Sequence, residues 1–260
     1  MYTLNNTKSA YAGSKKWTAY EPKSVNSKVI AVGSNMKFFR YKEIDFWLGI
    51  AASVNTPYNV QKSLPKYGLK NQISKNALMW TINAESQLCQ NSSAADLVIL
   101  DGSIHSKISK IKTVFSTQRH CLEFLKTMYP GENIVFISVM PPLEIISDPY
   151  GIASIMMCAI ANKCAGFGHV YEDIQYGSDL VISTTYARLE DWAMMLKIEM
   201  FGTNHDNNRM KSILNHLYAG DLMGYPTLIH AVRNMCIIDD SSLPYSGQFW
   251  KKPISKWTVT

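Results

Sequence analysis

Short apolar runs separated by polar or turn-forming residues recur along the chain, and runs of this length are typical of buried β-strands. They predict strands at residues 28–32, 96–101, 133–140, 180–185 and 195–201. The last run also alternates apolar and polar positions, which is typical of a strand with one buried face. A further apolar stretch, residues 46–54, fits either a strand or a short helix. Two prolines and a glycine in residues 55–72 predict a connecting loop.

Apolar residues at helical spacing lie between and after these runs. They predict helices at 74–90, around 121–128, at 149–165 and at 210–218, and a last helix that begins at Pro226, because proline is favoured at the first helical position. Strands that alternate with helices predict an α/β or α+β core.

Composition narrows the class of protein. A hydrophobic fraction of 47% with 18% charged residues indicates an ordinary globular protein. The longest apolar run, 152–161, has about half the length of a membrane span, and the polar N-terminus has no secretory signal. Five cysteines without a CxxC pair indicate reduced thiols, so we expect a cytoplasmic protein with no membrane contact. The net charge of +6 is compatible with a polyanionic partner but does not identify one.

Two acidic residues are candidates for chemistry. Glu85 shares an apolar helical stripe with Leu78, Ile82 and Cys89, where a charge is costly unless a cation or hydrogen-bond donors meet it. Asp101 ends a strongly apolar strand, at the edge where open sheets present ligands. Two such carboxylates suit an oxygen-liganded Mg²⁺ or Mn²⁺, which would activate water for phosphodiester cleavage.

Spacing alone leaves simpler interpretations open. Asp101-Gly102 is also the dipeptide expected in a type I′ hairpin turn. Glu85 would also fit the edge of its stripe, with its carboxylate in solvent. On these interpretations, the chain would be an α/β binding protein with no metal site at these two residues.

Several blocks of the chain occur in the order and rough spacing of one nuclease family. The blocks are KVIAVGSN at 28–35, the helix that carries Glu85, ADLVILDGSI at 95–104, LKIEMFG at 196–202 and GYPTLIHAVRN at 224–234. Together they resemble the NurA family of DNA-end-processing nucleases over residues 28–238. In that family, a helical glutamate precedes a strand ending in Asp-Gly-Ser, and a Gly-Tyr-Pro leads into a closing helix.

The resemblance implies an α/β fold, an RNase-H-like mixed β-sheet flanked by helices, over residues 28–238, with an N-terminal arm (1–27) and a C-terminal tail (239–260). It implies a nuclease of DNA-end resection and repair that uses Mn²⁺ or Mg²⁺. It also implies a homodimer beside a HerA-type hexameric ATPase. Glu85 and Asp101 match the family's metal-site carboxylates, and Tyr225 matches the tyrosine of Gly-Tyr-Pro. We expect the two carboxylates to converge on an oxygen-lined pocket beside bound DNA.

The chain departs from the family at two positions. The first aspartate of the pattern should precede Gly33, where Val32 stands. The closing histidine falls on Arg233, unless His230 replaces it. The nearest acidic substitutes for the lost aspartate, Glu43 and Asp45, lie on the next segment.

These losses leave two functions open within the family. The chain is either a nuclease, with full or weakened activity, or a catalytically inactive paralogue that binds DNA or the HerA-type ATPase. Lys107, Lys110, Arg119 and Arg233 are candidates for phosphate contacts, although a solvated charged face explains the first three almost as well.

Overall fold

The computed structural model describes residues 17–41, 44–55, 59–62, 66–69, 73–92, 94–140, 164–175, 180–202, 206–219, 227–238 and 258–259. Its strands are β1 (Thr18–Ala19), β2 (Val29–Tyr41), β3 (Ile44–Asn55), β4 (Asn59–Lys62), β5 (Lys66–Leu69), β6 (Leu97–Asp101), β7 (Ile134–Met140), β8 (Gly166–Gln175), β9 (Val181–Arg188), β10 (Met195–Phe201) and β11 (Thr258–Val259). Its helices are α2 (Ile73–Gln90), α3 (Ile104–Ile111), α4 (Gln118–Met128), α7 (Asn207–Ala219) and α8 (Thr227–Met235).

The described strands form one 11-stranded mixed sheet in the order β1-β8-β9-β10-β7-β6-β2-β3-β4, with β5 paired to β3 and β11 to β2. The centre is parallel, because β6 pairs in parallel with both β2 and β7. The pairs outside this centre are antiparallel, including the long β2–β3 pair.

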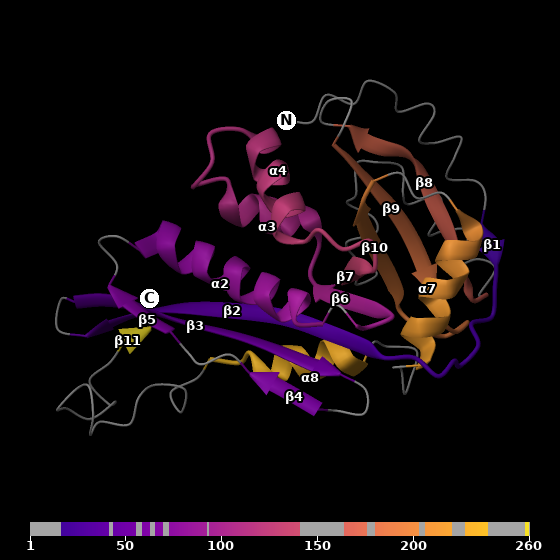
Figure 1. Ribbon diagram of the computed structural model, residues 1–260, viewed down its shortest axis with the longest axis horizontal. Helices are drawn as coiled ribbons and strands as arrows, with labels where there is room; N and C mark the ends of the chain where they lie inside the picture. Colours follow the sequence, from indigo (N-terminus) through magenta and orange to yellow (C-terminus); the bar gives the residue numbers. More distant parts are fainter. Residues whose placement is uncertain are drawn as a thin grey trace.

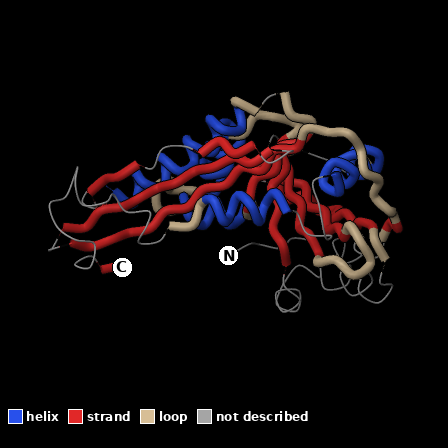
Figure 2. The backbone as a smooth tube through the Cα atoms, turned by 90° about the horizontal axis from the view of Figure 1, so that it is seen from below, coloured by secondary structure: helices blue, strands red, loops and turns tan. Residues whose placement is uncertain are grey.

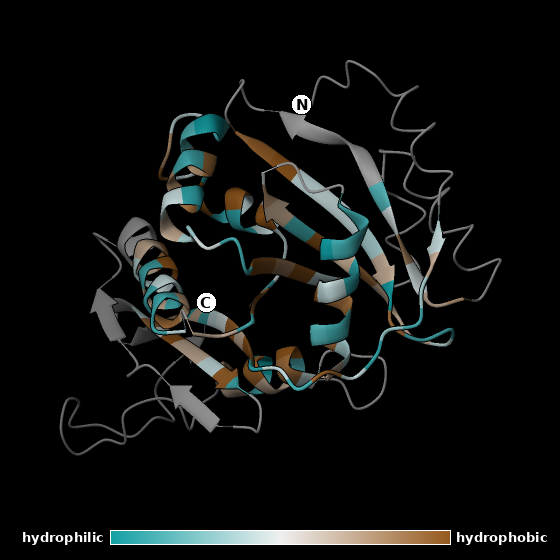
Figure 3. Ribbon diagram, turned by 45° about the vertical axis from the view of Figure 1, so that its right-hand side comes forward, coloured by the Kyte–Doolittle hydropathy of each residue, from teal (hydrophilic) through white to brown (hydrophobic). Residues whose placement is uncertain are grey.

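Helices cover both faces of the sheet (Figures 1 and 2). Alternate residues of the central strands divide between two cores. Ile30, Val98 and Leu100 pack with α2, α3 and α4, whereas Val29, Leu97 and other residues of opposite parity pack with α7 and α8. In Figure 3 the helices carry hydrophilic and hydrophobic colours side by side, as expected for helices with one buried face.

Most of the predicted strands and helices are confirmed. Residues 46–54 belong to a strand, β3, and the late amphipathic helix is α7. The last helix begins at Thr227, while Pro226 lies outside the described residues. The helix predicted at 149–165 also falls almost wholly outside them.

One prediction and one alternative interpretation were wrong. Residues 55–72 are not only a loop, because they contain β4 and β5, which pair with β3. Asp101-Gly102 is not a hairpin turn, because the chain continues from β6 into α3 and the next strand runs parallel. Gly102 has a φ of 92°, which favours glycine, and Ser103 then caps α3 by accepting a hydrogen bond from the Ser106 amide.

The described cysteines, Cys89, Cys121, Cys164 and Cys236, are free thiols. In the part of the chain that the structure describes, no helix has the length and apolar character to cross a membrane.

Candidate functional site

Glu85 lies in the core between α2 and the sheet, with 2% of its surface exposed. Three side chains donate hydrogen bonds to its carboxylate. The Lys107 ammonium and the Tyr129 hydroxyl each lie 2.6 Å from Oε2, and the Ser34 hydroxyl lies 2.7 Å from Oε1. We call these four residues the Glu85 cluster.

The Glu85 cluster is an internal ion pair with added hydrogen bonds. Lys107, on α3, is itself only 7% exposed, so both charges are removed from most of the solvent. Burial on this scale is tolerated only when the charges are paired and the remaining lone pairs are satisfied. The alternative interpretation, in which Glu85 lies at the edge of its stripe with its carboxylate in solvent, is therefore wrong.

The cluster also affects the titration of its neighbours. Burial, and then the nearby Glu85 charge, raise the pKa of the Tyr129 hydroxyl well above its usual value. The same two causes, in the same order, raise the pKa of the Cys89 thiol, against a smaller opposing effect of Lys107. Both groups stay protonated, and Tyr129 acts as a hydrogen-bond donor.

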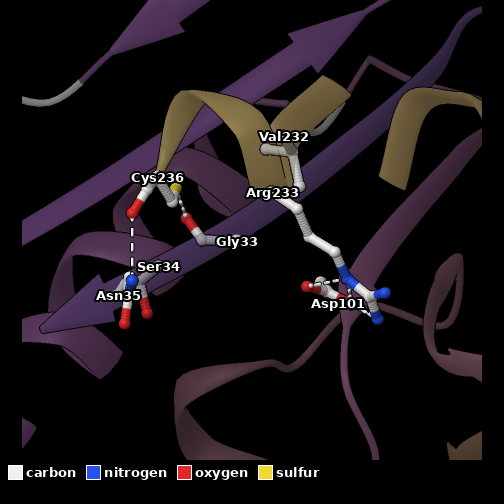
Figure 4. A pocket seen from close by; sticks show the side chains of 7 residues that line it. All are labelled: Gly33, Ser34, Asn35, Asp101, Val232, Arg233 and Cys236. Carbon is white, nitrogen blue, oxygen red and sulfur yellow. Dashed lines mark hydrogen bonds and ion pairs between the residues drawn. The ribbon is translucent and has the colours of Figure 1, made fainter. Parts of the chain in front are cut away.

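Asp101 lies at the end of β6 on the other side of the sheet, where α8 packs. The Arg233 guanidinium binds its carboxylate at two points: Nε lies 2.8 Å from Oδ2, and Nη2 lies 2.7 Å from Oδ1. This Asp101–Arg233 pair is accessible to water, because the side chains are 20% and 42% exposed. Figure 4 shows the arginine reaching from α8 to the aspartate.

A pocket of about 270 Å³ adjoins the pair. Its lining comes from the end of β6, from β2, from α8 and from the residue that follows α8. It consists of Gly33, Ser34, Asn35, Asp101, Val232, Arg233 and Cys236. Contacts between β2 and α8 fix its wall, because the Asn35 amide donates to the Cys236 carbonyl at 3.1 Å and the Cys236 thiol lies 3.4 Å from the Gly33 carbonyl.

Glu85 and Asp101 take part in separate sets of hydrogen bonds among the described residues. Lys107 of α3, Tyr129 after α4 and Ser34 of β2 donate to Glu85, and Arg233 of α8 donates to Asp101. Within the described ranges, no group of three or more His, Cys, Asp or Glu side chains could hold a metal ion. Each carboxylate already has a protein cation as its partner. The described residues therefore do not fit the Mn²⁺ or Mg²⁺ that the family resemblance implies.

The structure gives the other candidate residues different surroundings. A phosphate contact needs an exposed ammonium, and Lys107 is instead buried against Glu85. Lys110 is exposed on α3, and Arg119 is exposed on α4, where it pairs with Glu123 at 2.7 Å. His230 is exposed on α8. Tyr225 and Glu43 lie outside the described residues. Asp45 belongs to β3, and its backbone lies opposite that of Arg40 on β2.

Sequence reasoning missed one further buried acid, Glu199 on β10, which has no measurable exposure. Its carboxylate accepts a hydrogen bond from the Ile104 amide at 2.6 Å and pairs with Lys197 at 2.7 Å. It thereby fixes the start of α3, the helix that carries Lys107, directly after the Asp101 loop. The one available signal was an acidic residue between apolar neighbours in a strand.

Comparison with known proteins identifies the fold of this chain but not its function. No family model and no curated protein sequence matches the chain. Among solved structures, the NurA nuclease from Sulfolobus solfataricus superposes with a TM-score of 0.62 at 15% identity, over 88% of this chain and 83% of that one. This chain has a NurA-like fold. The prediction of an α/β fold with a mixed sheet flanked by helices is thus confirmed.

Two further NurA structures agree. One, a NurA with manganese, gives a TM-score of 0.57 at 10% identity and covers 92% of this chain and 91% of that one. The other, a NurA bound to dAMP and manganese, gives 0.52 at 10% identity, over 85% and 87%. The fold is therefore shared over more than four fifths of both chains in each of these three comparisons.

Proposed function

We propose that this chain is a NurA-like protein of DNA-end processing that binds DNA without metal-dependent hydrolysis of its own. The observation that carries the proposal is the Asp101–Arg233 pair. A divalent ion at Asp101 would have to displace a guanidinium that already binds both carboxylate oxygens. The second family carboxylate, Glu85, is occupied by Lys107 in the core.

Charge supports DNA as the partner. The chain has a net charge of +6, and α3, with the turn after it, presents the exposed side chains of Lys110 and Lys112. Basic side chains that approach phosphates release counterions, which favours binding at low salt. The NurA resemblance suggests two further partners: a second copy of the chain in a homodimer, and a HerA-type hexameric ATPase.

A second candidate function is a metal-dependent nuclease of low activity, in which Mn²⁺ or Mg²⁺ binds at Asp101. The exposure of Arg233 favours it, because a side chain that reaches solvent can leave its partner at small cost. Two of the similar NurA structures contain manganese, which makes the same metal the first to test.

Incubation of the wild-type protein with linear DNA and Mn²⁺ or Mg²⁺ separates the two candidates. We expect no more cleavage than with Asp101→Asn, which keeps the shape of the side chain and removes its charge. Cleavage that Asp101→Asn abolishes would establish the nuclease instead.

DNA binding is measured on the same proteins by titration at increasing salt. We expect affinity to fall with salt and to be weaker for Lys110→Glu. Lys23→Glu, an equal charge change in the exposed segment before β2, is the matched control. Equal losses in both variants would mean that net charge, and not α3, governs binding, and salt-independent binding would contradict the proposal.

A further inference from the structure

Strand β2 has one edge that other strands cover only in part. Its first edge pairs with β3 over residues 30–41, almost the whole length of the strand. Its second edge pairs with β6 over residues 29–32 and with β11 at residues 39–40. Among the described residues, no strand pairs with this second edge over residues 33–38. We call this stretch the open edge of β2.

The backbone of the open edge can accept a further strand. The Met36 amide donates to the side chain of its own neighbour, Asn35, at 2.9 Å, and so points away from β3. Because the hydrogen-bonding direction alternates along an antiparallel strand, the backbone groups of Ser34 and Phe38 face the same way. A row of such groups at a sheet edge is a template for an added strand. The Asn35 amide oxygen occupies the place that a peptide carbonyl would take.

There is space beside the start of the open edge. Its first three residues, Gly33, Ser34 and Asn35, line the pocket together with Asp101, the last residue of β6 (Figure 4). The pocket therefore lies next to β2 where β6 has ended. A strand that continued the line of β6 along β2 would begin there.

The two faces of the sheet differ in chemistry beside the open edge. On the α2 face, Met36 and Phe38 are half-buried apolar side chains. On the α8 face, the described charges nearby are the Lys37 ammonium and the Asp101–Arg233 pair, which together are net positive. Side chains of an added strand would alternate between these faces. The open edge therefore fits a strand in which apolar and acidic residues alternate.

We propose that the open edge of β2 is a strand-addition site for an extended segment of a protein partner, in which apolar and acidic residues alternate. In this mode of recognition, backbone hydrogen bonds give affinity and alternate side chains give specificity. The same edge already accepts one short strand, because β11 pairs with residues 39–40 beyond the open stretch (Figure 1). The partner strand would lie between β11 and the end of β6. The proposal does not depend on whether the chain binds or cleaves DNA.

The test uses a fluorescent heptapeptide in which valine and glutamate alternate. One control peptide has the same composition with valines and glutamates in separate blocks, and another has lysine in place of glutamate. Fluorescence anisotropy with the full chain should show saturable binding of the first peptide and weaker binding of both controls. Hydrogen exchange, followed by mass spectrometry, should show that the first peptide slows exchange at residues 33–38.

Two substitutions examine the edge itself. Met36→Pro removes the amide that faces the open edge, at a position where proline breaks no ladder hydrogen bond. It should weaken binding of the first peptide about tenfold, because a peptide carbonyl loses its donor. Met36→Ala keeps the amide, serves as the matched control and should weaken binding less. Lys37→Gln leaves the backbone unchanged and should weaken binding about two- to fivefold, so the test stands even if Met36→Pro does not fold.

The results decide between a protein partner and other occupants. Slowed exchange at residues 33–38 that Met36→Ala keeps and Met36→Pro loses would support the proposal. Equal binding of the three peptides, or binding that leaves exchange at the open edge unchanged, would overturn it. A single-stranded oligonucleotide that slows exchange there, when the peptide does not, would also overturn it and make the edge a DNA contact. Cleavage of DNA is measured separately and bears only on the proposed function.

Discussion

The central sheet carries two carboxylates that are each paired with a cation. One pair is buried and the other is partly exposed to water. On the α2 side, the Glu85 cluster buries a carboxylate with an ammonium, a phenol and a hydroxyl. On the α8 side, the Asp101–Arg233 pair stays in contact with water. Where water is excluded, removing a partner leaves an unpaired buried charge, but where water enters, the solvent replaces the partner. The contrast predicts that removing one partner costs more stability in the Glu85 cluster than in the Asp101–Arg233 pair.

The largest effect is expected from Lys107→Met, which keeps the aliphatic stem and removes the ammonium. It should lower the free energy of unfolding by about 3–5 kcal/mol, because Glu85 then stays buried without a cation. Chemical denaturation measures the loss. The double variant Glu85→Gln/Lys107→Met is the control and should recover much of it. A loss no larger than that of an exposed pair would mean that water reaches Glu85 and that the contrast between the faces is wrong.

A smaller effect is expected from Tyr129→Phe, which removes one donor to Glu85 and leaves the ring, whose centroid lies 5.4 Å from that of Phe136. The loss should be about 1–3 kcal/mol in the free energy of unfolding, because a buried acceptor loses a hydrogen bond. Phe124→Leu, a change in a half-buried aromatic residue outside the cluster, shows how much ring packing alone contributes. If Tyr129→Phe costs nothing, the phenol does not stabilise the buried carboxylate.

The same tyrosine gives the cluster a pH signature. Because its pKa is raised in the folded protein, the unfolded chain releases the phenol proton first as the pH rises. The stabilising contribution is complete below the unfolded pKa, near 10, and is lost above it. Denaturation curves at alkaline pH should therefore show a steeper loss of stability in the wild type than in Tyr129→Phe. Parallel curves would contradict the raised pKa.

The local pattern of the sequence predicted the buried strands and the late helices, because their residues repeat at the spacing of one buried face. It did not predict β4 and β5, which are short and lie among prolines and glycine, so that only pairing with β3 defines them. β8 was also missed. Its sequence, GFGHVYEDIQ, mixes polar and apolar residues and has no clear strand pattern.

The candidate site shows the same division between local and distant information. The position of Glu85 in an apolar stripe indicated that it needs a partner, and Asp101 was placed correctly at a strand end. The partners themselves are distant in sequence: Lys107 is 22 residues from Glu85, and Arg233 is 132 residues from Asp101. Which cation meets which carboxylate depends on how helices pack across the sheet, and one sequence without its fold does not contain that information.

The smallest effect is expected from Arg233→Ala, on the open face. It should lower the free energy of unfolding by no more than about 1 kcal/mol at moderate salt, because water and ions solvate the Asp101 carboxylate that is left. Arg233→Lys should lie between the wild type and alanine, because an ammonium keeps the charge but not the two parallel hydrogen bonds. Denaturation at low and high salt measures both differences, which should shrink as salt is added. A loss as large as that of Lys107→Met would mean that Arg233 stabilises the fold as much as Lys107 does, and it would contradict the difference proposed between the two faces.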